Sequence, residues 1–207
     1  MFGLEAAAEA IYTPKSMEAG FAFGGTIQVL EVVIACVLIW FRRERLADIG
    51  LKRPKSWLRT FAIGTAYAAV VFVLIYFSEK AGFHRDLSRF KDVQGNLELT
   101  IYGVFYAFIG AGFYEEFMFR GFLMQGLAMC FGASRKAWFG ACLIQALLFG
   151  AAHAYQNPLG MAIAGTLGLL LGILVIASGR NLWLAIIGHG LYDASRFVLI
   201  YFQGLPT

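Results

Sequence analysis

LGMAIAGTLGLLLGILVIA, residues 159–177, contains no charged residue. An apolar run of about this length is what a helix needs to cross a bilayer core about 30 Å thick. The rest of the chain agrees, since 59% of its 207 residues are hydrophobic and only 14% are charged, against roughly 25% charged in soluble globular domains. The sequence therefore predicts an all-α protein that crosses a membrane several times.

Further apolar stretches precede and follow this one, separated by polar or basic turns. The chain has room for about six crossings joined by short loops. The stretch 99–131 is longer than one crossing requires, so it forms either one long tilted helix or two pieces broken near Gly110 and Gly112. We expect a polytopic transmembrane bundle with about six spans, near residues 20–41, 57–77, 99–131, 137–154, 159–177 and 182–202.

The expected bundle is a single membrane domain over residues 1–207. Within it, residues 1–98 are predicted to supply an N-terminal helical hairpin and a polar loop, and residues 99–207 a helical core. The polar stretch 78–98, which contains His84 and Arg85, is predicted to be a solvated loop.

The positive charges of the chain indicate its topology. The formal net charge is +4, and Lys and Arg beside membrane spans hold their loop on the cytoplasmic side. We therefore predict membrane lipids, and no nucleic acid, as partners of the main basic loop. Its basic residues are Arg42, Arg43, Arg45, Lys52, Arg53, Lys55 and Arg59.

Small residues recur every fourth position in the fifth predicted span, at Gly160, Ala164, Gly168 and Gly172. Such a stripe on one face lets a neighbouring helix approach closely. We interpret it as an assembly feature.

Ionisable side chains inside apolar segments are costly, and they usually face the bundle interior or mark a functional pathway. Glu31 stands alone and is predicted to be either a helix contact or a lumen-facing residue, and not a catalyst. The others come from three predicted helices, which is more than inert contacts between helices require. They are Glu115, Glu116, Arg120, His153, His189 and Asp193.

These side chains suggest a division of roles. Glu116 and Arg120 are one helical turn apart and can pair, which leaves Glu115 free to hold a water molecule and to accept its proton as a general base. His153 is predicted to orient that water. His189 with Asp193 is predicted to hydrogen-bond the oxyanion formed when water adds to a peptide carbonyl.

Three motifs carry a resemblance to a known family. EEFMFRG, residues 115–121, resembles the E-E-x-x-x-R-G motif of the CAAX-protease and bacteriocin-processing family, also called the CPBP or Abi family. FGAAH, residues 149–153, resembles its F-x-x-x-H motif, and HGLYD, residues 189–193, its H-x-x-x-N/D motif. The resemblance implies an intramembrane endopeptidase related to the type II CAAX prenyl proteases, with residues 99–207 as the catalytic helical core.

The resemblance also implies the site residues, namely Glu115 as the base, supported by Glu116 and Arg120, with His153, His189 and Asp193 completing the site. Asp193 stands where prenyl-protein-processing members often have Asn, and an ionised Asp accepts rather than donates hydrogen bonds. The short chain resembles a compact prokaryotic member in the cell (inner) membrane. Its expected substrate is a peptide or protein, with or without an attached lipid.

Two hypotheses on cofactor use follow from the sequence, one without a metal ion and one with zinc. A metal-free glutamate mechanism is favoured, since the H-E-x-x-H motif of many zinc peptidases is absent. The alternative is a metalloendopeptidase, with zinc held by Glu115, His153 and His189 and a water in the open position.

Two other classes of function compete with the peptidase. Intramembrane Glu and His chains also build proton relays, as in a proton-coupled transporter, although the paired broken helices or inverted repeats common in transporters are not evident in the sequence. A catalytically silent membrane adaptor would keep the same bundle without an aligned site.

Overall fold

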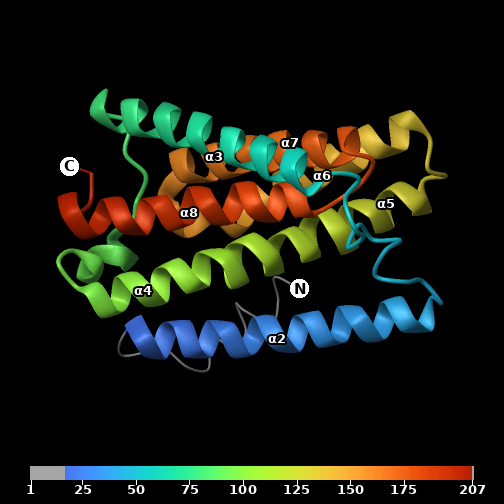
Figure 1. Cartoon of the computed structure of the whole chain (residues 1–207), viewed down its shortest axis with the longest axis horizontal. Helices are drawn as coiled ribbons and strands as arrows, with labels where there is room; N and C mark the ends of the chain where they lie inside the picture. Colours follow the sequence, from blue (N-terminus) through green and yellow to red (C-terminus); the bar gives the residue numbers. More distant parts are fainter. Residues whose placement is uncertain (1–16, 207) are drawn as a thin grey trace.

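The computed structural model describes residues 17–206, and these contain helices and no strand. The helices run side by side along the long axis of the molecule (Figure 1). In chain order they are α2 (Met17–Phe41), α3 (Trp57–Lys80), the 3₁₀ helix η1 (Ser88–Val93), α4 (Leu97–Tyr106), the π-helix η2 (Ala107–Leu123), α5 (Met124–Cys130), α6 (Arg135–Ala152), the 3₁₀ helix η3 (Ala154–Gln156), α7 (Asn157–Ala177) and α8 (Trp183–Gln203).

Short polar side chains begin several of these helices. Ser56, Asn96 and Ser134 each accept a hydrogen bond from a backbone N–H in the first turn of α3, α4 and α6, respectively. The side chain of Asn157 does the same for the first turn of α7, where Pro158 follows it. These caps satisfy N–H groups that have no partner within the helix. The polar residues that were expected to form turns between the apolar stretches therefore cap the N-termini of the helices that follow.

The segments α4, η2 and α5 form one uninterrupted helical stretch, Leu97–Cys130. The alternative of two pieces broken near Gly110 and Gly112 is therefore wrong. A Cβ atom on Gly112 would lie 2.9 Å from the carbonyl oxygen of Ile186 on α8. Gly112 thus serves close packing of η2 against α8, and the helix continues through it.

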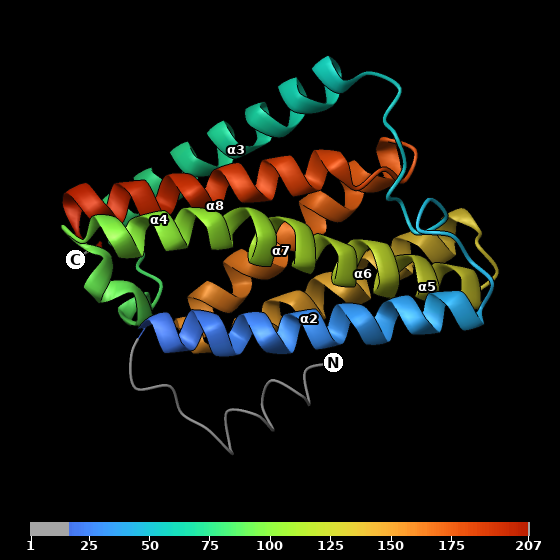
Figure 2. The same ribbon diagram turned by 60° about the horizontal axis from the view of Figure 1, so that its bottom comes forward.

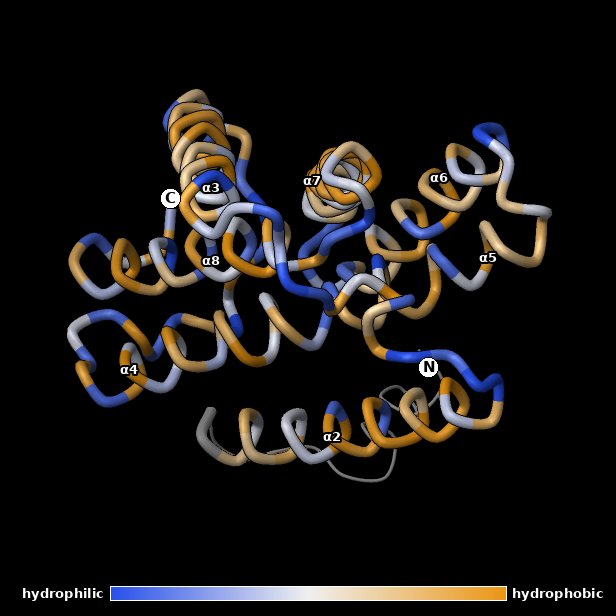
Figure 3. The backbone as a smooth tube through the Cα atoms, turned by 45° about the vertical axis from the view of Figure 1, so that its right-hand side comes forward, coloured by the Kyte–Doolittle hydropathy of each residue, from blue (hydrophilic) through white to orange (hydrophobic). Residues whose placement is uncertain are grey.

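Four of the described helices are long and apolar enough to cross a membrane: Ala19–Phe41, Trp57–Lys80, Leu97–Cys130 and Ala154–Ala177. Helices α6 and α8 are not among them, because Arg135 and Lys136 begin α6 and charged residues lie along α8. The chain is an integral membrane protein with an all-helical fold, as predicted. In Figure 3, hydrophilic residues, drawn in blue, lie mainly in the connections between helices, whereas α7 consists mostly of hydrophobic residues, drawn in orange.

Helices α2 and α3 do not pack as a pair, so the predicted N-terminal hairpin is wrong. They lie on opposite sides of the molecule (Figures 1 and 2), with α2 against η2 and α3 against α8. The reason lies in the loop between them, which is tied to the turn before α8. Gly50 O accepts a hydrogen bond from Leu182 N–H, and Lys52 O accepts one from the Asn181 side chain.

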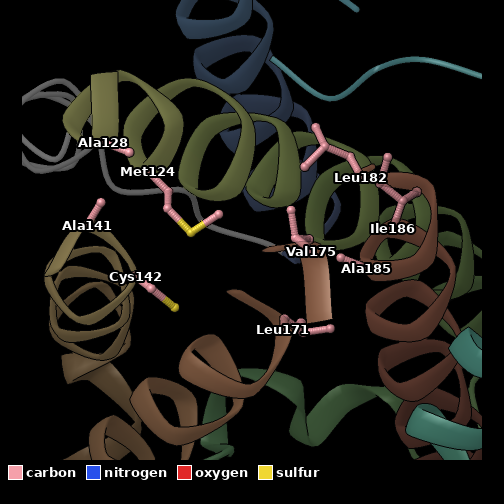
Figure 4. Packing of buried hydrophobic residues seen from close by; sticks show 9 residues of the cluster. All are labelled: Met124, Ala128, Ala141, Cys142, Leu171, Val175, Leu182, Ala185 and Ile186. Carbon is pink, nitrogen blue, oxygen red and sulfur yellow. The ribbon is translucent and has the colours of Figure 1, made fainter. Parts of the chain in front are cut away.

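Buried apolar side chains join the helices around the centre of the bundle. One cluster links α5, α6, α7 and α8 (Figure 4); it consists of Met124, Ala128, Ala141, Cys142, Leu171, Val175, Leu182, Ala185 and Ile186. The small-residue stripe of α7 faces α6 here, since a Cβ atom on Gly172 would lie 2.6 Å from Cys142 Sγ. The prediction that this stripe serves close helix packing is confirmed.

The polar stretch 78–98 is solvated only in part, since most of its residues after α3 are exposed but several side chains at the end of α3 and beyond it are buried. Glu79 is 6% exposed, the Arg85 side chain is 9% exposed, and Val93 is fully buried. Backbone N–H of Asp86 donates to Gln156 O at the start of α7. The stretch therefore folds back onto the bundle.

Candidate active site

A buried ion pair on η2 begins the site. Arg120 Nη1 donates to Glu116 Oε1 at 2.8 Å, and both side chains are fully buried. The same Glu116 oxygen lies 2.8 Å from His189 Nδ1 on α8. An ionised carboxylate only accepts hydrogen bonds, so Nδ1 carries the proton in this contact. Glu116 thus fixes the ring of His189, as expected of a supporting rather than a reacting carboxylate.

The other ring nitrogen of His189 faces two further carboxylates. Its Nε2 lies 3.8 Å from Glu115 Oε2 and 3.5 Å from Asp193 Oδ2. Glu115 Oε2 is buried and makes no hydrogen bond to the protein. A carboxylate oxygen in this position is free to accept a hydrogen bond from a water molecule.

The phenyl ring of Phe149 connects the second histidine to this group. It lies 4.7 Å from the ring of His153 and 6.0 Å from that of His189, centroid to centroid, and the Arg120 guanidinium lies 4.3 Å from its centroid. His153 Nδ1 lies 2.8 Å from Phe149 O, and a carbonyl oxygen only accepts. His153 therefore keeps Nε2 as its acceptor nitrogen.

The geometry explains why these helices meet here. His153 follows the last residue of α6, and α6 packs along α7. A Cβ atom on Gly190, next to His189, would lie 3.3 Å from Ala107 O of η2. Glycines on both sides of the η2–α8 contact thus bring His189 within reach of the two glutamates.

Gly168 supports the site from α7, and its replacement by leucine is expected to lower the stability of the bundle. A Cβ atom there would lie 3.0 Å from Phe149 Cδ1 and 3.2 Å from Arg120 Nη2. Overpacking of this kind costs about 1–3 kcal/mol. Thermal unfolding in detergent measures the loss, with Gly140→Leu on α6 as the control, because no atom lies within 4 Å of a Cβ there. Equal unfolding temperatures for the two variants would contradict this packing role.

The choice between the metal-free and the zinc mechanism stays a prediction. Across the described part of the chain, no three His, Cys, Asp or Glu side chains are grouped so that they could hold a metal ion. The candidate ligands Glu115, His153 and His189 therefore do not converge. The chemistry considered below uses side chains alone.

Glu31 is a helix contact, one of the two predicted alternatives. It is 3% exposed and accepts a hydrogen bond from the Tyr114 hydroxyl. Gln28, one turn earlier, donates to the Tyr106 hydroxyl at 2.8 Å. These two contacts hold α2 against the helix that carries Glu115 and Glu116.

A second buried charge cluster beside the site escaped the sequence analysis. Arg196 Nη2 on α8 donates to Glu79 Oε1 at 2.8 Å, and Arg85 Nη2 donates to the Tyr192 hydroxyl at 3.1 Å. Arg196 lies within an apolar stretch, so the rule that intramembrane charges mark function would have found it. Glu79 and Arg85 carry no such signal, because they lie in what reads as a polar loop.

The three motifs meet in one place, with EEFMFRG on η2, FGAAH at the end of α6 and HGLYD on α8. A family model described as type II CAAX prenyl endopeptidase Rce1-like matches residues 95–195. This region, slightly less than half of the chain, is similar to the Rce1-like family. The match agrees with the resemblance of the three motifs to the CAAX-protease family, and it supports a membrane protease.

The Rce1-like core begins just before α4 and ends within α8, so it contains all the predicted site residues. Helices α2 and α3 and the stretch that holds Glu79 and Arg85 lie outside it. Neither a curated protein nor a solved structure matches the chain. The roles of the individual site residues in the Rce1-like core stay predictions.

Proposed function

We propose that the protein is an intramembrane endopeptidase that adds water to a peptide carbonyl in or beside the bilayer. The contact that carries this proposal is His189, held at Nδ1 by Glu116 with its Nε2 facing Glu115 and Asp193. A fixed imidazole beside an unpaired carboxylate supplies both an acid and a base to one reacting centre. The Rce1-like core supports the same class of reaction.

In the first step, Glu115 accepts a proton from a water molecule whose oxygen attacks the carbonyl carbon. A carbon–oxygen bond forms, and the carbonyl electron pair moves to the oxygen. His189 in its imidazolium form donates from Nε2 to this oxyanion, and Asp193 holds the imidazolium. One such donor contributes about 10²–10³ in rate where it has been measured. His153, with Nε2 as acceptor, orients the water.

In the second step, the oxyanion reforms the carbonyl and the carbon–nitrogen bond breaks. The leaving nitrogen takes the proton that Glu115 accepted from water, and Glu115 becomes a carboxylate again. Glu116 and Arg120 stay paired throughout, so their charges keep the ring of His189 in place. Water and the peptide are the only reactants in both steps, as in the metal-free mechanism favoured from the sequence.

An apolar groove between α3 and α7 offers a place for the substrate. Its volume is about 570 Å³, and Tyr67 of α3 lies along it. Tyr67 also packs into the cluster that contains Tyr192, the neighbour of Asp193. We propose that an apolar peptide segment or an attached lipid lies in this groove. The side chains that line it are Ile63, Ala66, Tyr67, Val70, Val71, Leu74, Ile75, Ala162, Ile163, Thr166, Leu167, Leu170 and Leu174.

We further propose that α6 and α8 also cross the membrane, as the fourth and sixth of six spans in chain order, in a prokaryotic cell membrane. Helix α8 packs along both η2 and α3, and α6 packs along α7. Each thus runs beside a helix that is long and apolar enough to span. Their polar residues point to a role inside the bundle, where charged groups are tolerated.

The test is cleavage of a quenched-fluorescent peptide library by the detergent-solubilised protein. Wild type is expected to cut, and His189→Ala and His153→Ala are expected to lose about 10²-fold or more in rate. Gln203→Ala, at the exposed end of α8, serves as the control. Cleavage should persist with a zinc chelator. If wild type cuts nothing but takes up protons in liposomes, the transporter reading replaces this one.

A further inference from the structure

The segment that follows α3 and enters η1 touches both of the elements that carry the histidines. We call residues 84–89 the clasp. On one side, Asp86 N–H donates to Gln156 O at 3.1 Å, and the Asn157 side chain donates to His84 O at 3.2 Å. Gln156 and Asn157 lie in the turn that follows His153. The backbone of the clasp is therefore bonded to the His153 turn.

A ring contact strengthens this side of the clasp. The Arg89 guanidinium lies 4.4 Å from the centroid of the Tyr155 ring. The Tyr155 ring in turn stacks on His153, with centroids 5.9 Å apart and planes inclined by 28°. Cation–π and stacking contacts of this kind restrict the rings that they join. The clasp thus reaches His153 through a side chain as well as through its backbone.

On the other side, Arg85 reaches into α8. Its Nη2 donates to the Tyr192 hydroxyl at 3.1 Å, and its side chain is only 9% exposed. Asp193 follows Tyr192 directly in α8. Glu79 Oε1 lies 3.8 Å from Arg85 and 2.8 Å from Arg196. The buried arginine is therefore anchored to the helix that carries His189 and Asp193.

We propose that the clasp is a positioning element of the peptidase and that Arg85 is its central positioning residue. It holds the His153 turn and the His189–Asp193 face of α8 in one arrangement, although these come from separate helices. A misplacement of about 1 Å in a catalytic group can cost about 10²-fold in rate. This inference rests on the proposed function, and it concerns residues outside the matched family region of 95–195.

The experiment compares Arg85→Met with Lys91→Met in cleavage of the peptide substrate. Lys91 is exposed on η1, so its variant removes a nearby positive charge without touching the clasp. Arg85→Met is expected to lower kcat by about 10- to 100-fold with little change in KM. Glu79 keeps Arg196 as its partner in this variant, so the fold is retained. Tyr192→Phe removes a single hydrogen bond and is expected to lower kcat by about 2- to 10-fold.

Hydrogen–deuterium exchange gives a second readout that does not depend on cleavage. Arg85→Met should speed exchange in peptides that cover residues 153–160 and 189–193, whereas Lys91→Met should not. A rise in KM at unchanged kcat would overturn the proposal in favour of substrate binding by Arg85. Wild-type kcat in Arg85→Met would also overturn it. If wild type cuts no peptide, the proposed function fails. Unchanged exchange in Arg85→Met would separately overturn the proposal that the clasp positions the two histidines.

Discussion

Glu115→Gln is expected to abolish peptide hydrolysis while the bundle stays folded. General bases contribute about 10²–10⁴-fold to rate, and an amide cannot accept the proton of the attacking water. The substitution should not weaken the fold, because Glu115 Oε2 has no hydrogen-bond partner within the protein. We therefore expect kcat to fall by at least about 10³-fold at an unchanged unfolding temperature.

The matched control is Glu98→Gln, which changes an exposed glutamate in the first turn of α4 on the same continuous helix. It should retain wild-type kcat. Rates are measured on a peptide that wild type cuts, and folding is checked by thermal unfolding of the same detergent samples. A Glu115→Gln protein that cuts at the wild-type rate would refute Glu115 as the base.

Arg120→Met is expected to cause the largest loss of stability of any single substitution considered for this protein. It leaves the fully buried Glu116 carboxylate without its arginine and with the hydrogen bond from His189, and breaking a buried ion pair costs about 3–5 kcal/mol. The Arg120 contact with the Phe149 ring is lost as well. Denaturant unfolding in mixed micelles should show a lowered midpoint or no folded protein.

The double variant Glu116→Gln with Arg120→Met tests whether the charge is the cause. It removes both charges, and replacing both partners of a buried pair is often close to neutral. We expect it to be more stable than Arg120→Met alone. The control is Arg45→Met, which breaks the ion pair between Arg45 and Asp48 at the surface. The Arg45 side chain is 81% exposed, so this variant should unfold like wild type. A double variant no more stable than Arg120→Met would point to packing instead.

The sequence could predict which residues of one helix lie on the same face, because their spacing follows the helix period. Glu116 and Arg120, one turn apart, do pair. Placing His189 beside Glu116 needed the family motifs, since no local pattern relates η2 to α8. Gly112 and Gly190 lie at the contact between these helices. From the sequence alone, a glycine that allows close helix packing cannot be distinguished from one that breaks a helix.

The predictions that failed concerned polar segments. A basic loop reads as solvent-exposed, yet its backbone is bonded to the turn before α8, and this separates α2 from α3. Arg85 reads as part of a charged loop, yet its partners Glu79 and Tyr192 come from two helices. A hydropathy value describes the free-energy cost of burying one residue by itself. It contains no information on a partner, distant in the sequence, whose hydrogen bond or charge offsets that cost.

The π-helical form of η2 makes the length of this segment as important as its composition. The N–H of Met124 still bonds the carbonyl of Phe119, five residues back, where an α-helix would bond four back. Removing one residue between Ala107 and Phe113 would favour relaxation to the narrower α-helix. Glu115 and Glu116 would then turn about the helix axis, away from His189. Away from Gly110 and Gly112, where a Cβ atom would meet close neighbours, substitutions in this stretch are therefore expected to be tolerated far better than the deletion of a single residue. Such a deletion would change the phase of the helix without altering either glutamate.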